Sequence, residues 1–257
     1  MKIDIADNIQ EVTRNLGHFS RKQAPFALSL ALNNTAADVQ AEEKHEILDV
    51  FDNPTRYTQN SVFKTRATKK NLEVTVGLKD GKLNPGKGIP AAKFLHAQIV
   101  GGSRSLKRFE VALRSVGVLP NGYYIVPGEG AKKDRWGNMA RGQIVQILSY
   151  FKSFSESGFR ANMTDKRKAS LKRGGRKTRG MEYFVVRPGE GSRLHPGIWQ
   201  RVGFGFGKAI KPIMIFVRHA TYEENFDFEF VAINTIKKNF NKNLDRAFEY
   251  AERTAKR

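Results

Sequence analysis

The sequence predicts an α+β fold with a helical N-terminal arm, a central mixed or antiparallel sheet with short helices, and a long C-terminal helix. Apolar residues recur at helical spacing near both ends of the chain, whereas several central segments alternate apolar and polar residues at a period of two. Turns rich in Gly and Pro separate these segments. With 257 residues, of which 40% are apolar, the chain can build a buried core as one large domain or two small ones.

The N-terminal arm is predicted to span residues 1–53. Residues 3–19 have the spacing of a weak amphipathic helix, and Pro25 suits the first turn of a second helix that is rich in Ala and Leu. Asn33-Asn34 interrupts the apolar stripe of this second helix. Asp52-Asn53-Pro54 is expected to end it, because the residue before a proline avoids the helical conformation.

The centre of the chain predicts strands and short helices. Residues 56–66 and 72–78 predict a hairpin with one solvent-exposed face, joined by a turn at 68–71. Pro-Gly-Glu-Gly follows an aromatic-rich strand at 127–130 and again at 188–191, so these two strands could pair in one sheet. The remaining central elements are helices at 90–100, 106–116 and 143–154, and strands at 123–126, 182–186, 198–206 and 210–219.

The C-terminal helix is predicted at about residues 225–254. Its start is ambiguous, because Phe226, Phe228 and Phe230 also fit the period of a strand. We expect its apolar stripe, together with Phe248, to pack against the central sheet or a neighbouring subunit. The stripe steps by three and four residues through Ile233, Ile236, Phe240, Leu244, Ala247 and Ala251.

The net charge of +20 is unevenly distributed along the chain. Residues 1–53 hold 5 Lys and Arg against 9 Asp and Glu, and residues 223–257 hold 7 of each kind. Residues 54–222 therefore carry 33 basic against 9 acidic residues, a balance of +24. A region with this charge attracts polyanions such as nucleic acid, acidic proteins or anionic lipid, although the same charge also keeps a protein soluble.

The densest positive charge is a basic tract that continues to Glu182 without an acidic residue. Because it has Gly174-Gly175 at its centre and no apolar anchor, residues 163–180 are expected to form a flexible, protease-sensitive loop. The tract predicts sequence-independent contact with DNA, contact with an acidic protein, or a solvated loop without a partner. It holds no aromatic residue, which argues against base stacking. Its basic residues are Lys166, Arg167, Lys168, Lys172, Arg173, Arg176, Lys177 and Arg179.

No motif predicts catalysis, a cofactor or a metal site. The loop at 81–88 resembles a phosphate-binding loop, but Gly88 replaces the Ser or Thr that would hold Mg²⁺ and Pro85 removes a backbone N–H. The glycines at 203–207 lack the spacing and the following helix of a dinucleotide site, which favours glycines within a strand. The five His are isolated from one another, so we expect no enzyme and keep a nuclease as the least favoured alternative.

The absence of Cys excludes disulfides, thiolate metal sites and cysteine nucleophiles, and it fits a reducing compartment. The N-terminal residues lack the pattern of a signal peptide, and no apolar run approaches the roughly 20 residues of a membrane span. We therefore expect no membrane contact.

Five segments carry a family resemblance through their order along the chain. They are residues 22–36 (KQAPFALSLALNNTA), 54–62 (PTRYTQNSV), 134–138 (DRWGN), 143–149 (QIVQILS) and 195–201 (HPGIWQR). Together they resemble the minor tail protein Z family of tailed bacteriophages and prophages. The basic tract and the loop at 81–88 stand outside this resemblance.

The resemblance implies a structural virion protein, found in the tail or neck, that completes the tail or joins it to the head. It implies a homo-oligomeric ring around the DNA path, assembled in the host cytoplasm, without catalytic or metal-binding residues. Its expected partners are other tail, neck or portal proteins, with non-specific contact to genomic DNA. The competing interpretation is a basic DNA-binding packaging or accessory protein that is not retained in the virion.

Within such an assembly, the acidic arm at 1–53 is expected to contact the basic body at 54–257 of a neighbouring subunit. The Ala-rich stretch at 24–37 would let another helix approach closely, although the arm could equally fold back on its own subunit. The residues expected at this assembly interface are Phe26, Leu28, Leu30 and Leu32.

Overall fold

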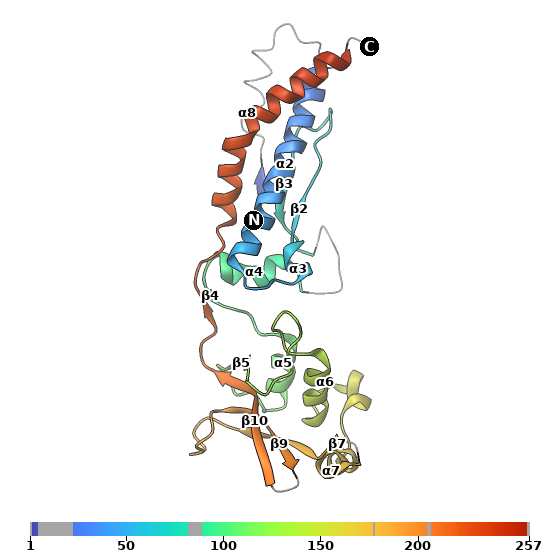
Figure 1. Cartoon of the computed structure of the whole chain (residues 1–257), viewed down its shortest axis with the longest axis vertical. Helices are drawn as coiled ribbons and strands as arrows, with labels where there is room; N and C mark the ends of the chain where they lie inside the picture. The colour runs from blue at the N-terminus through green and yellow to red at the C-terminus, as the bar shows by residue number, and fades with distance from the viewer. Residues whose placement is uncertain (1, 5–22, 82–88, 177, 205–206, 256–257) are drawn as a thin grey trace. The chain divides into compact units, whose positions relative to one another are not determined.

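The computed structural model describes residues 2–4, 23–81, 89–176, 178–204 and 207–255, and its fold is α+β as predicted (Figure 1). The chain forms two compact units. Unit 1 comprises Met1–Gly102 and Tyr222–Arg257, and unit 2 comprises Ser103–Thr221. The short strands β4 (Gly102–Ser103) and β11 (Thr221–Tyr222) lie where the chain crosses between the units.

This division corrects the predicted boundary between an arm at 1–53 and a body at 54–257. Both ends of the chain build unit 1, and unit 2 is inserted between them. The reason is that the apolar faces of the first and last long helices bury each other, which sequence separation alone does not reveal.

Unit 1 is built on an antiparallel pair of long helices, α2 (Gln23–Val50) and α8 (Phe228–Ala255), which lie side by side in Figure 1. The two helices pack through a buried alanine cluster, whose small side chains allow the helix backbones to approach. The cluster consists of Ala27 and Ala31 of α2 with Ala247 and Ala251 of α8, bordered by Phe26, Leu30, Leu244 and Phe248.

The α2–α8 contact also corrects the predicted assembly interface. The side chains of Leu28 and Leu32 are 1% and 0% exposed, and Phe26 and Leu30 pack at the edge of the alanine cluster. The helix that approaches the Ala-rich stretch is α8 of the same chain, which is the alternative that the sequence left open. Leu28 and Leu32 are therefore not available to a neighbouring subunit, whereas Phe26 and Leu30 are only partly buried.

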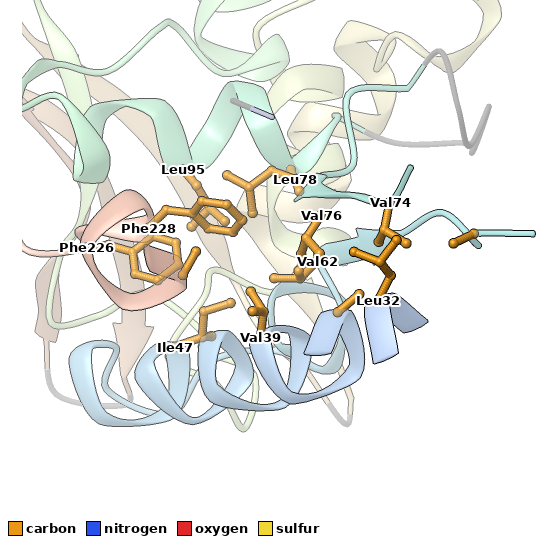
Figure 2. Packing of buried hydrophobic residues seen from close by; sticks show 14 residues of the cluster. Leu32, Val39, Ile47, Val62, Val74, Val76, Leu78, Leu95, Phe226 and Phe228 are labelled. Carbon is orange, nitrogen blue, oxygen red and sulfur yellow. The ribbon is translucent and has the colours of Figure 1, made fainter. Parts of the chain in front are cut away.

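A three-stranded antiparallel sheet packs with the helix pair in the order β1 (Lys2–Asp4), β3 (Thr75–Leu78), β2 (Val62–Lys64). The predicted hairpin is confirmed. The prediction that one of its faces is exposed to solvent is wrong, because all four residues of β3 are buried. Figure 2 shows side chains of both hairpin strands in one cluster with α2. The cluster includes Leu32, Val39 and Ile47 of α2, Val62, Val76 and Leu78 of the hairpin, Leu95 of α4 (Ala91–Ile99), and Phe226 and Phe228.

Other predictions for unit 1 have mixed outcomes. Residues 56–66 are only partly strand, because the Thr55 side chain accepts a hydrogen bond from Thr58 N and caps the short helix α3 (Arg56–Gln59). Residues 2–4 are a strand, so no helix begins at residue 3, and residues 5–22 of that predicted helix lie outside the described residues.

The predicted ends of the long helices agree well with the structure. Helix α2 ends at Val50, just before Asp52-Asn53-Pro54, and α8 begins at Phe228. Phe226 and Phe228 are fully buried. Ile233 and Phe230 are 37% and 64% exposed, so Ile233 leaves the predicted stripe. The remaining stripe residues are buried or pack against buried clusters: Ile236, Phe240, Leu244, Ala247 and Ala251.

Unit 2 is built on a four-stranded antiparallel sheet in the order β5 (Tyr124–Pro127), β10 (Gly207–Val217), β9 (Gly197–Phe204), β8 (Met181–Val186). The helices α5 (Arg108–Ser115) and α6 (Arg141–Tyr150) bury Leu113 and Ile147 with residues of this sheet. The strands before the two Pro-Gly-Glu-Gly turns, β5 and β8, therefore share a sheet but lie at opposite edges and do not pair.

A buried carboxylate ties α5 to β5 inside unit 2. Glu110 is 0% exposed, and its oxygens accept hydrogen bonds from the Arg104 guanidinium at 2.7 and 2.6 Å, Lys107 N at 2.6 Å and Ile125 N at 2.7 Å. Burial by itself would raise the pKa of Glu110, but these donors outweigh it and hold the pKa below its usual value. The ion pair is thus fully satisfied and structural.

Candidate polyanion-binding surface

Positive charge is concentrated in unit 2. Its residues 103–221 contain 24 Lys and Arg against 7 Asp and Glu, which gives +17 of the chain's +20. Unit 1 contains 21 basic against 18 acidic residues and is nearly balanced at +3. The basic region predicted at 54–222 is therefore divided between the two units, and most of its charge, including the basic tract, lies in unit 2.

The first half of the basic tract is a helix, α7 (Asp165–Arg173), so the prediction of a loop over 163–180 is wrong for these residues. The Thr164 side chain caps α7 by accepting a hydrogen bond from Arg167 N at 3.3 Å. Asp165 lies in the first turn, and Lys172 and Arg173 lie in the last, where each charge favours the helix dipole. The tract is also rich in residues that favour helices, namely Lys, Arg, Ala and Leu. The prediction of a loop did not take this helix propensity into account.

The second half of the tract is a tight hairpin, β6 (Gly174–Gly175) with β7 (Thr178–Arg179). Gly174 has a φ of 77°, which favours glycine. At Gly180, an added Cβ would lie 2.2 Å from the Lys172 carbonyl oxygen, so only glycine fits against the end of α7. Gly203 N of β9 donates a hydrogen bond to Gly180 O at 2.9 Å, which ties the hairpin to the sheet.

Glu182 of β8 anchors α7 to the sheet. Its side chain is 14% exposed, and its two oxygens pair with Lys172 Nζ at 2.8 Å and with Arg201 of β9. The hydrogen bond from Lys172, followed by that from Arg201, lowers the pKa of Glu182 despite its partial burial. The Lys168 ammonium lies 4.9 Å from the centre of the Tyr150 ring, which adds a cation–π contact between α7 and α6.

These contacts bring four of the predicted basic residues around an open pocket of about 550 Å³. Arg173 and Arg176 are exposed and, within the described part of the chain, have no ion pair. Among the described residues that line the pocket there is no aliphatic or aromatic side chain. The pocket is lined by Lys172, Arg173, Arg176 and Arg179 together with Gly175, Thr178, Gly180 and Gly203.

The other described basic residues of the tract do not line this pocket. Lys166 and Arg167 are exposed on the first turn of α7, and Lys168 lies over Tyr150. Lys177 lies outside the described residues. Only the C-terminal half of the tract therefore forms a concave surface.

Sequence reasoning missed Glu182, Arg201, Gly180 and Gly203 as parts of this surface. Glu182 is the first acidic residue after the tract, and its position alone could have suggested a local partner for the lysines. The sequence predicts Gly203 within a strand, and it does lie in β9. Its contact with Gly180 joins segments 23 residues apart, and no local sequence pattern indicates that contact.

Several other candidate sites can be assessed. Among the described residues, no group of three or more His, Asp or Glu side chains is arranged to hold a metal ion. The predicted loop at 81–88 lies outside the described residues except for Gly81. No helix in the described ranges is both long enough and apolar enough to cross a membrane.

The fold and the surface together define an α+β protein whose inserted unit carries a fixed, arginine-rich pocket. Comparison of the chain with known proteins gives no matching family model, no matching curated protein and no matching solved structure.

Proposed function

We propose that this protein is a structural virion subunit of a tailed bacteriophage, located in the tail or neck, that assembles as a ring around the DNA path. The observation that carries the proposal is the segregation of +17 charges into unit 2, where α7 and its hairpin hold arginines on a fixed surface. A basic surface of this kind attracts the phosphate backbone of DNA without reading its sequence, which suits a subunit that lies beside the DNA path. The resemblance of the five ordered segments to the minor tail protein Z family supplies the biological setting.

Unit 1 is suited to the contacts between subunits. Its charge is nearly balanced, which lowers the repulsion between copies of a basic protein. Leu28 and Leu32 are buried within the subunit. Exposed apolar side chains of unit 1 would therefore form the contact between subunits instead. Phe230 and Val100 are 64% and 62% exposed, and burial against a neighbouring copy would remove them from water. Other tail, neck or portal proteins would complete the assembly.

The alternative is a basic DNA-binding packaging or accessory protein that is not retained in the virion. The basic pocket fits this function equally well, since it requires DNA contact but no ring. Stoichiometry in finished particles distinguishes the two functions.

Quantitative mass spectrometry of purified phage particles tests the proposal. We expect the chain at a fixed copy number matching a small ring, and mass photometry of the purified protein should give an oligomer of that size or a monomer that assembles with its neighbours. Presence in infected cells together with absence from purified particles would favour the packaging protein. Metal-dependent cleavage of DNA by the purified chain would contradict both functions.

A further inference from the structure

The residues that line the pocket at the C-terminal end of α7 indicate which class of ligand binds there and which side chains contact it. We propose that Arg173, Arg176 and Arg179 bind the phosphodiester backbone of a nucleic acid duplex, with Lys172 at the pocket's edge, and that the first turn of α7 does not take part. This inference deepens the proposed function and rests on it for the identity of the duplex. Of the eight basic residues in the tract, it assigns duplex binding to the four that line the pocket.

Backbone contacts give the pocket a defined shape, so it is not a chance group of charged side chains on the surface. Gly174 and Gly180 allow the hairpin to fold against the last turn of α7, and Gly203 N holds it to β9. Glu182 pairs with Lys172 and Arg201, which fixes the helix on the sheet. The backbone that carries the three arginines is therefore positioned before a ligand arrives, which reduces the entropy lost on binding.

Arginine presents a planar fork of N–H donors that matches two oxygens of a phosphate, and it remains charged at every physiological pH. Lys172 is already paired with Glu182 at 2.8 Å, whereas Arg173 and Arg176 are exposed and have no ion pair within the described part of the chain. Arg173 and Arg176 are thus the main anion-binding groups, and Arg179 lines the same pocket.

The composition of the lining favours a nucleic acid duplex over other polyanions. Interfaces with proteins usually have an apolar core, but the described lining has no aliphatic or aromatic side chain. Sites for single strands stack bases on aromatic rings, which this lining also lacks. Contacts to a duplex backbone need only positive charge and polar donors, so this ligand fits the lining best.

The test measures binding of a short fluorescent DNA duplex to the full-length protein by anisotropy, over a series of salt concentrations. One variant combines R173Q, R176Q and R179Q. Its matched control combines R108Q, R141Q and R193Q, which removes the same charge from exposed arginines of unit 2 outside the pocket. Circular dichroism and thermal unfolding check that both variants fold like the unaltered protein.

We expect the pocket variant to lose about tenfold or more in affinity at moderate salt and the control to lose much less. The slope of log K against log salt should fall by about 2 to 3 in the pocket variant, because each lost phosphate contact removes about 0.9. Two duplexes of unrelated sequence should bind equally. Equal losses in the two variants, a strong preference for one duplex, or competition by polyglutamate as effective as by unlabelled DNA would each overturn the inference.

A second pair of variants tests the geometry without changing charge. G180A places a Cβ 2.2 Å from the Lys172 carbonyl oxygen and should displace the hairpin, whereas an added Cβ at Gly142 of α6 meets no atom within 4 Å in the described structure. We expect G180A to weaken duplex binding severalfold and G142A to leave it unchanged. Unchanged binding by a folded G180A would contradict a built pocket. These results are independent of particle composition, so failure here leaves the ring proposal standing, and absence from particles leaves duplex binding standing.

Discussion

At the scale of single residues, Glu43 of α2 is a buried acidic group. Its side chain is 0% exposed, and neither carboxylate oxygen has a hydrogen-bond partner in the described part of the chain. Burial, reinforced by repulsion from Glu46, Asp227 and Glu42, raises the pKa of Glu43 to about 9. At neutral pH the folded protein therefore holds this carboxyl in its protonated form, while the unfolded chain ionises it.

This difference makes the stability of unit 1 depend on pH. Between about pH 4.5 and pH 9, the folded state keeps a proton on Glu43 that the unfolded state has released. The free energy of unfolding therefore falls as pH rises through this window, by up to about 1.4 kcal/mol per pH unit for one group.

We predict that E43Q stabilises the protein in proportion to pH, because glutamine resembles the protonated acid and does not ionise. The gain should be small near pH 5 and reach a few kcal/mol near pH 8, about 1.4 kcal/mol for each pH unit. Urea unfolding at both pH values measures it. The control E249Q alters an exposed glutamate of α8 and should show no such trend. An equal effect of E43Q at both pH values would show that Glu43 is ionised in the folded state.

At the scale of secondary-structure elements, the contact between α2 and α8 is the main feature of unit 1. Close approach at the alanine cluster is complemented by a polar link, in which Asn243 Nδ2 donates to Thr35 Oγ1 at 3.2 Å and to Asp38 Oδ2 at 2.8 Å. Asn33, which seemed to interrupt the apolar stripe, exchanges two hydrogen bonds of 3.0 Å with the backbone of Ala67. Such paired polar groups fix the register of apolar surfaces that could otherwise slide.

Two phenylalanines of α8 provide a matched test of this packing. Phe240 packs against the core of unit 1, whereas Phe230 is 64% exposed. We predict that F240A lowers the free energy of unfolding by about 2–4 kcal/mol, somewhat less than for a fully buried phenylalanine. F230A should change it by about 0.5 kcal/mol or less. Chemical denaturation of both variants measures the difference, and similar effects at the two positions would mean that the helix is rotated relative to the core.

At the scale of the whole molecule, the chain is a discontinuous unit with a continuous unit inserted into it. Unit 2 has a core of its own around Leu113, Ile147 and Ile198, and it runs without interruption from Ser103 to Thr221. Unit 1 needs both termini, because α2 supplies one side of its core and α8 the other.

We predict that deletion of residues 1–53 abolishes the unfolding transition of unit 1 but leaves that of unit 2. The deletion removes Leu32, Val39 and Ile47 from the core and exposes the apolar stripe of α8. Residues 103–221 expressed alone should fold, because their core is complete. Thermal unfolding followed by circular dichroism, with NMR spectra of both proteins, tests this. A truncated chain that keeps two transitions would restore residues 1–53 as a separate arm.

Features that depend on local pattern could be predicted from the amino-acid sequence. Apolar spacing located α8, and Asp52-Asn53-Pro54 located the end of α2. Composition and charge counts revealed the basic middle of the chain, and alternation predicted the hairpin of β2 and β3. These features depend on neighbouring residues, whose propensities and periods are readable over one element.

Which surfaces pack against each other could be seen only in the folded chain. The apolar stripe of α2 is equally suited to a neighbouring subunit and to its own chain, and only the fold pairs Ala27 with Ala251. The arginine pocket likewise depends on Gly180 lying against α7 and beside Gly203. Burial of an apolar face is favourable against any complementary partner, so local sequence fixes that a face will be buried but not what buries it.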